Sequence, residues 1–127
     1  MRKAIIYFCL ILPFVLGCEE SESQKISELQ FPGINLSEIE DGTYRGRFMH
    51  HNNLYETEVS IRDHRIEDIQ VLHSEGDEYD QKAFAVLEMV IDQQSLQVDS
   101  VTGATKSSKL YLLTIYNALT GKEIIIE

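Results

Sequence analysis

The sequence predicts an α+β domain in which an antiparallel sheet packs with two helices. Three segments between residues 41 and 73 alternate apolar and polar residues with the period of β-strands. Two later segments place their apolar residues at helical spacing instead. A run of strands followed by a run of helices favours an α+β fold, because a doubly wound parallel sheet would alternate the two.

Each of the three strands is predicted from its alternation. The first follows a turn at Asp41-Gly42, the second covers residues 54–61, and the third covers residues 65–73. Turn residues at 50–53 and 63–64 connect them, which predicts a meander. The residues expected to share a face within each strand are Tyr44, Gly46 and Phe48, then Tyr55, Thr57, Val59 and Ile61, then Ile69, Val71 and His73.

The helical period begins at Asp80, which is a candidate N-cap for a helix reaching Gln94. The second helix is predicted from about Thr105 to Leu119, with Gly121 as its C-terminal stop. The last residues, KEIIIE, predict one more short strand. We expect both helices to lie on the sheet.

The first residues have the pattern of a bacterial lipoprotein signal. Met1-Arg2-Lys3 precedes an apolar run from Ala4 to Leu16, and the sequence turns polar directly after Gly17-Cys18. The apolar run is too short to cross a bilayer, which takes roughly 20 residues.

The stretch ending at Cys18, VLGC, resembles a lipobox, although Leu16 departs from the usual small residue there. Removal of residues 1–17 would also remove Cys9, the other cysteine, and an exported chain with one cysteine at this boundary is best explained by lipidation. We therefore expect a signal peptide over 1–17 and a lipid anchor on Cys18, in a bacterial cell envelope facing outside the cytoplasm.

Residues 18–40 are predicted to be the lipidated cysteine and a flexible tether. They are rich in Ser, Glu and Gln and are interrupted by Pro32-Gly33. A flexible chain of this length has an r.m.s. reach of about 25 Å. Residues 41–127 then remain for one small folded domain.

The charge of the chain argues against a nucleic-acid partner. The formal net charge is −10, and loss of Arg2 and Lys3 with the signal makes it −12. Phosphate-backbone binding needs a basic patch, which the sequence lacks. The four histidines, His50, His51, His64 and His73, are predicted to be ordinary polar residues rather than metal ligands, because no H-x-x-x-H or cysteine spacing accompanies them.

The stretch DSVTGATKSS, residues 99–108, lies where a loop enters the second predicted helix. A helix N-terminus attracts anions through its unpaired N–H groups and its dipole. Ser107 and Ser108 are expected to donate to phosphate oxygens, and Lys106 adds a positive charge. The alternative is a structural role, in which Thr102 or Thr105 caps the helix, Gly103 makes the turn and Asp99 holds an Asx-turn.

Residues 99–105, DSVTGAT, resemble the flavinylation motif D-x-x-[ST]-G-A-T of the FMN-binding domain family. This family supplies flavin-carrying subunits of the sodium-translocating NADH:quinone oxidoreductase and of the Rnf complex. The resemblance extends to DGTYRG at Asp41, to DQQSLQVDSVTGATKSSKL and to NALTG, and so covers about residues 41–121.

The resemblance implies that Thr105 carries FMN through a phosphoester bond. A separate flavin transferase, using FAD and a metal ion, would make the bond, since an unactivated threonine hydroxyl is a poor nucleophile. Asp99 would present the motif to the transferase or serve as a turn residue, while Thr102, Gly103 and Ala104 would shape the loop.

The function that this implies is a lipid-anchored, extracytoplasmic electron carrier with unknown donor and acceptor proteins. The cofactor would perform the chemistry, so no separate catalytic residues are expected. Tyr44, Phe48 and Met49 either pack on the flavin ring or belong to the core. The alternatives are a non-redox envelope lipoprotein that acts as a binding module, and a flavin relay subunit of a larger reductase.

Overall fold

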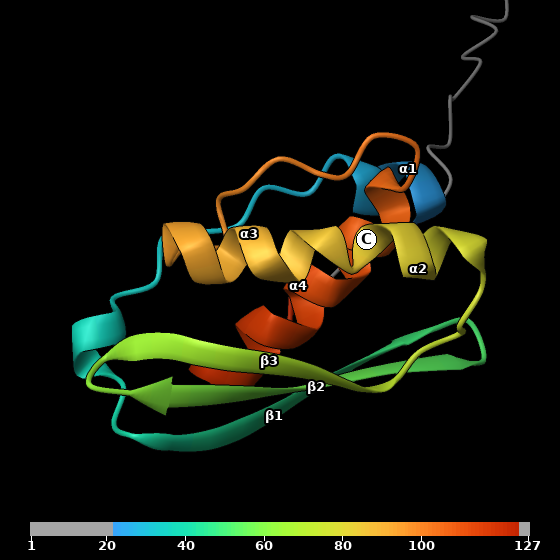
Figure 1. Ribbon diagram of the computed structural model, residues 1–127. Coiled ribbons are helices and arrows are strands. Elements are labelled where there is room, and N and C mark those ends of the chain that lie inside the picture. The colour runs from blue at the N-terminus through green and yellow to red at the C-terminus, as the bar shows by residue number, and fades with distance from the viewer. Residues whose placement is uncertain (1–21, 125–127) are drawn as a thin grey trace, which may run out of the picture.

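A computed structural model of the chain describes residues 22–124. Its elements are α1 (Glu22–Ser27), the short 3-10 helix η1 (Leu36–Glu38), β1 (Gly42–His50), β2 (Asn53–Arg62), β3 (Arg65–His73), α2 (Glu78–Ala83), α3 (Ala85–Gln93) and α4 (Thr105–Thr120). The strands form one antiparallel sheet in the order β1-β2-β3, and the helices lie above one face of it (Figure 1). The predicted α+β fold with a three-stranded meander is confirmed.

The buried face of the sheet follows the predicted alternation in β2 but not throughout β3. All four residues assigned to one face of β2, from Tyr55 to Ile61, are buried. In β3 the register shifts, because Ser60 pairs with Asp68 whereas Ile61 pairs with Ile66. Glu67 is therefore an extra residue, a β-bulge, which lets Ile66 and Ile69 both face the core although they are three positions apart.

Helix α4 crosses the sheet directly beneath the other helices and forms the centre of the core. Its middle, from Leu110 to Ile115, is buried on all sides. It approaches β1 so closely at Gly46 that an added Cβ atom would lie 1.7 Å from the carbonyl oxygen of Thr114. The opposite face of the sheet carries ion pairs between Arg45 and Glu58 and between Arg47 and Glu56.

The first predicted helix is two helices, and its predicted cap was wrong. The N-cap of α2 is Asp77, whose side chain accepts a hydrogen bond from the amide of Asp80. Asp80 lies inside the helix and is fully buried. The path changes at Phe84, where the amide bonds the carbonyl of Gln81 three residues back, a tighter turn than the α-helix makes. In contrast, α4 begins and ends within a residue of its prediction, with Gly121 as C-cap.

The prediction of a flexible tether is wrong for the residues that the structure describes up to Phe31. Ile26 and Phe31 are buried, and α1 packs on α4. The Lys109 ammonium donates to the carbonyl of Leu29 at 2.7 Å, and Gln97 donates to that of Phe31 at 3.1 Å. One apolar residue within α1, Ile26, and Phe31 in the irregular stretch after it dock this polar segment on the domain.

Three terminal predictions fall partly or wholly outside residues 22–124. The signal peptide and Cys18 lie outside the described residues. The final strand was predicted over 122–127, of which residues 122–124 are irregular and the rest are outside. Within the described part of the chain, no helix is both long and apolar enough to span a bilayer.

Candidate functional site

The N-terminus of α4 has no side-chain cap. Ala104 is the cap residue, and no side chain accepts a hydrogen bond from the first helical turn. Thr102 and Thr105 are both exposed. The structural alternative, in which one of these threonines caps the helix, is therefore wrong, and the positive end of the helix dipole lies at the protein surface.

A tight turn positions Thr105 as the first residue of α4. The amide of Ala104 donates to the carbonyl of Val101 at 2.9 Å, and Gly103 within this turn has φ +81. An added Cβ atom at Gly103 would meet nothing within 4 Å, so its backbone conformation and not lack of space favours glycine there. The buried Ala104 side chain fixes the turn to the core, as expected for residues that shape the loop.

Ser108 is part of the scaffold beneath the motif and not a phosphate ligand. Its hydroxyl donates to the carbonyl of Ala104 at 2.7 Å and accepts from the amide of Val101 at 3.1 Å. With its hydroxyl engaged on both sides and its side chain fully buried, the expectation that Ser108 donates to phosphate is wrong. Ser107 is also buried, but it lines the neighbouring cavity.

Asp99 lies apart from the rest of the motif. It lines a separate hollow with Ser100 and Lys109, and its charge acts on the Lys109 ammonium. The amide of Val101, which an Asx-turn at Asp99 would use, donates to Ser108 instead. The structure thus brings Gly103, Ala104, Thr105 and Ser107 together and leaves Asp99 on another face of the loop.

Beside Thr105 is a cavity of about 250 Å³ that joins the motif to the segment between β3 and α2. One wall comes from residues 103–107, and the other comes from Tyr55 and from Glu75, Asp77 and Tyr79. Pockets that enclose a drug-sized ligand usually hold about 300–1,000 Å³. A planar ring system bound here would therefore be only partly enclosed and would keep an edge in solvent.

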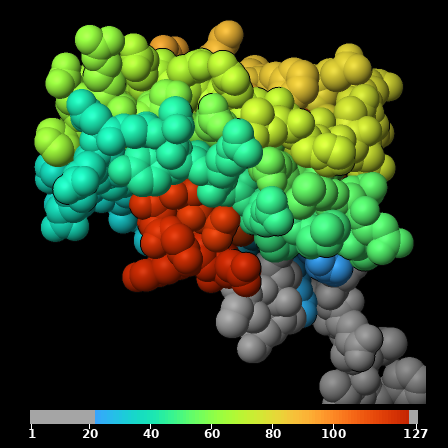
Figure 2. All heavy atoms as spheres, turned by 90° about the horizontal axis from the view of Figure 1, so that it is seen from below, coloured from blue at the N-terminus to red at the C-terminus, as the bar shows by residue number. Residues whose placement is uncertain are grey.

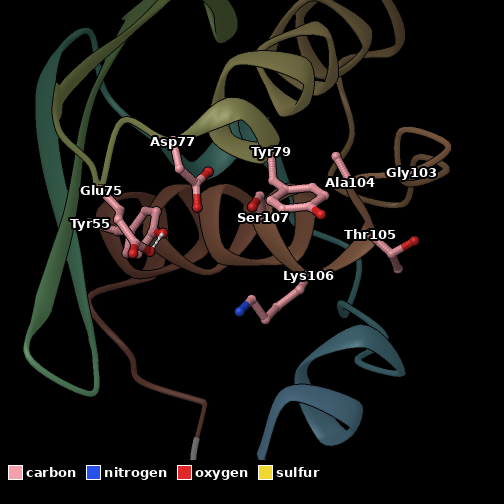
Figure 3. A pocket seen from close by; sticks show the side chains of 9 residues that line it. All are labelled: Tyr55, Glu75, Asp77, Tyr79, Gly103, Ala104, Thr105, Lys106 and Ser107. Carbon is pink, nitrogen blue, oxygen red and sulfur yellow. Dashed lines mark hydrogen bonds between the residues drawn. The ribbon is translucent and has the colours of Figure 1, made fainter.

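Figure 3 shows how the side chains around the cavity are directed. In this view Ser107 lies between Asp77 and the Tyr79 ring, and Ala104 lies on the other side of that ring, while the Lys106 side chain extends to the side on which Tyr55 lies. We call the wall formed by Tyr55, Glu75, Asp77 and Tyr79 the acidic wall. The hydroxyl of Thr105 points outward, away from it. This hydroxyl is therefore open to an enzyme that approaches from outside.

The acidic wall is held by hydrogen bonds that centre on the buried pair Tyr55 and Asp80. The single Tyr55 hydroxyl proton is shared between Asp80 at 3.2 Å and Glu75 at 3.3 Å, and the second Asp80 oxygen accepts from the amide of Gly76 at 2.9 Å. Burial, together with the charges of Asp80 and Glu75, raises the pKa of Tyr55 far above its usual value of about 10. Tyr55 therefore remains a neutral hydrogen-bond donor throughout the physiological pH range.

Sequence reasoning missed most of the second wall. Of the aromatic and methionine candidates named above, Phe48 and Met49 line a different hollow, near Ile124, and Tyr44 packs against the core. The segment SEGDEY, residues 74–79, has three acids and a tyrosine where the chain enters α2. Its composition was a usable signal for a turn, but only the fold shows that it faces the motif.

The site has features that suit a phosphate-bearing ligand with an attached ring system. It combines the exposed N-terminus of a long helix with an adjacent cavity that contains two tyrosines. Comparison with known protein families shows which family the chain matches. The family model described as FMN-binding domain matches residues 54–120, more than half of the chain.

The protein therefore belongs to the FMN-binding domain family, and its expected cofactor is FMN. The match begins at Leu54, so it covers β2 to the end of α4 and not β1. No curated protein and no solved structure matched the chain.

Proposed function

We propose that Thr105 carries FMN through a phosphoester bond and that the protein is a lipid-anchored electron carrier of the bacterial cell envelope, facing outside the cytoplasm. The observation that carries this proposal is the position of the Thr105 hydroxyl. It is exposed, it belongs to the first residue of an uncapped helix, and it lies beside a cavity with aromatic walls.

The attachment is a group transfer from FAD by a separate, metal-dependent flavin transferase. The threonine oxygen forms a bond to the phosphorus of the FMN half, the pyrophosphate P–O bond breaks, and AMP leaves. The hydroxyl proton is released to a base of the transferase. Within this chain no described side chain hydrogen bonds to the Thr105 hydroxyl as a base would, which agrees with the need for an external enzyme.

The residues around Thr105 suit a bound FMN phosphate and ring. The first N–H groups of α4 and the Lys106 ammonium offer positive charge to the phosphate. The ring of Tyr79, which is 56% exposed, offers a surface for the isoalloxazine, and the open cavity leaves it within reach of partner proteins. When bound, FMN supplies the capacity to accept and release electrons, and the protein holds and tunes it.

The carrier role and the location rest on the N-terminal lipobox-like sequence and on the family. A lipid anchor on Cys18 would hold the domain at the envelope, next to redox donors and acceptors of the membrane. A flavin relay subunit of a larger reductase is the second candidate, since its flavin site would be the same, and copurification of a stable partner protein would favour it.

The first experiment is expression of the chain with and without a flavin transferase in an exported compartment. We expect the intact mass to rise by one FMN minus one water only with the transferase, and the denatured protein band to fluoresce. Thr105→Ala should abolish both signals, whereas the exposed control Thr43→Ala should retain them. Because Thr105 is not a cap, its substitution should change the free energy of unfolding by less than about 0.5 kcal/mol.

An unmodified mass beside an active transferase and a labelled control substrate would overturn covalent attachment. Flavin that persists in Thr105→Ala would overturn the assignment of the site. Acylation is tested separately by the mass of the N-terminal peptide that contains Cys18.

A further inference from the structure

Three metal-ligating side chains meet where α1 lies against the turn between β1 and β2. The Nδ1 atom of His50 is 3.4 Å from one carboxylate oxygen of Glu22, and the Nδ1 atom of His51 is 3.9 Å from the other. One ligand atom from each residue lies within 4.8 Å of both others. Figure 2 shows the blue start of α1 against green atoms of the sheet.

The distances suit a common cation. Ligands about 2.0–2.1 Å from a tetrahedral zinc ion are roughly 3.3–3.4 Å apart, close to the observed separation of His50 and Glu22. His51 is 3.9 Å from the other oxygen of the same carboxylate, and its side chain is 66% exposed, so rotation of that side chain can bring its nitrogen to the same ion. Two imidazoles and one carboxylate are also a ligand set that zinc takes in proteins.

The Nδ1 atom of His50 has the Glu22 carboxylate beside it as an ion-pair partner but makes no hydrogen bond to any described residue. His50 is 3% exposed, and its Nδ1 atom is buried. A buried polar atom without a hydrogen bond is unfavourable, and a bound metal ion would give this nitrogen a ligand role.

We propose that Glu22, His50 and His51 form a site for a divalent transition metal of the zinc class, with a water molecule as the remaining ligand. The metal ties α1 to the β1–β2 turn. The histidines are adjacent in sequence and the carboxylate comes from a segment expected to be a flexible tether. The spacing of ligand residues in the sequence therefore did not indicate this site. The three residues come together only in the folded chain.

The site is distinct from Thr105, and its test does not depend on flavin. Full-length chain purified in detergent and stripped with a chelator is titrated with Zn²⁺ against a chromogenic competitor, with and without FMN attached. We expect one Zn²⁺ per chain in both forms. Glu22→Gln, His51→Ala and His50→Ala should each weaken binding at least about tenfold, whereas His73→Ala, an exposed histidine elsewhere, should not.

A structural readout separates this site from adventitious binding. Saturating Zn²⁺ should slow amide hydrogen exchange in α1 and raise the thermal midpoint of the wild type but not of Glu22→Gln. Glu22 and His51 have exposed side chains, so their variants should fold even if His50→Ala does not. Absence of stoichiometric binding, or equal binding by wild type, Glu22→Gln and His51→Ala, would overturn the proposal.

Discussion

The phenol group of Tyr55 donates a hydrogen bond to Oδ1 of Asp80 over 3.2 Å, and both side chains are buried. This pair couples the middle of the sheet to the first helix after it. Through the bonds of Asp80 to the Gly76 amide and of Tyr55 to Glu75, it also sets the acidic wall of the cavity.

Tyr55→Phe should therefore lower the free energy of unfolding by about 1.5–3 kcal/mol, the usual loss for a buried hydrogen bond to a charged group. Tyr44→Phe is the matched control, because the Tyr44 hydroxyl donates to the carbonyl of Glu40 in an exposed position. Its cost should be about 1 kcal/mol or less. Urea unfolding followed by circular dichroism measures both, and equal costs would show that the Asp80 bond adds no stability.

Alkaline pH should destabilise the fold through two buried tyrosines. Burial raises the pKa of Tyr111 to about 12, and that of Tyr55 rises further. Both groups ionise near pH 10 in the unfolded chain, so their contribution to stability is complete below about pH 10 and is lost above it. Between about pH 10 and 12 each should reduce the free energy of unfolding by about 1.4 kcal/mol per pH unit.

Urea unfolding at several alkaline pH values tests this dependence. Tyr111→Phe should remove the contribution of one tyrosine, so the free energy of unfolding should fall less steeply with pH than in the wild type. If the free energy of unfolding fell equally steeply with pH in the wild type and in this variant, Tyr111 would not be a cause of the alkaline destabilisation.

Gly46→Ala should be among the most destabilising single substitutions in the domain. The added methyl group would lie 1.7 Å from the carbonyl oxygen of Thr114, so β1 and α4 must separate. We expect a loss of at least about 3 kcal/mol, at the upper end of the cost of overpacking. Gly33→Ala is the control, since nothing lies within 4 Å of its Cβ position, and it should change the thermal midpoint little.

Ser108→Ala should lower the free energy of unfolding more than Ser107→Ala does, although both residues are buried. Ser108 loses its bonds to Ala104 and Val101, which should cost about 1–3 kcal/mol and loosen the turn before Thr105. Flavin attachment by the transferase should slow in Ser108→Ala because the turn is less ordered. Unfolding curves and timed intact-mass spectra measure the two effects, and an unchanged attachment rate would show that the turn need not be rigid.

Charge beside the cavity should set the potential of a bound flavin. Glu75 lines the cavity, and a negative charge disfavours the gain of electrons. Glu75→Gln should raise the midpoint potential by about 20 mV, which corresponds to about 1 kcal/mol for a two-electron couple. Lys106→Met should lower it by a similar amount, and spectroelectrochemistry of the flavinylated protein distinguishes the two signs. Glu38→Gln, far from the cavity, should leave the potential unchanged.

Local patterns in the sequence predicted much of the fold. Alternation located three strands, and α4 was bounded by its apolar stripe and by Gly121. Two features escaped because they depend on contacts between distant segments. Asp80 was taken for a cap since its burial with Tyr55 has no local signal, and residues near Ile26 were taken for a tether since their few apolar side chains acquire meaning only against α4.

The same limit applies to the candidate site. The motif from Asp99 to Thr105 was visible in the sequence. The sequence does not, however, show which hydrogen-bond partners each serine or threonine hydroxyl group has. Ser108 proved to hold the turn, and Thr102 and Thr105 proved not to cap the helix. The second wall, from Tyr55 and residues 75–79, comes from two other parts of the chain and required the tertiary structure.

The docking of α1 on α4 changes how the domain would sit on its proposed anchor. Only four residue steps separate Cys18 from Glu22, the first residue of α1, and at most about 3.6 Å is spanned per step. The segment from Cys18 to Glu22 therefore spans no more than about 14 Å. This is little more than half the reach expected of a flexible segment that ends at residue 40. A carrier held so close cannot sample a wide hemisphere, so its redox partners would have to present their own cofactors near the lipid surface.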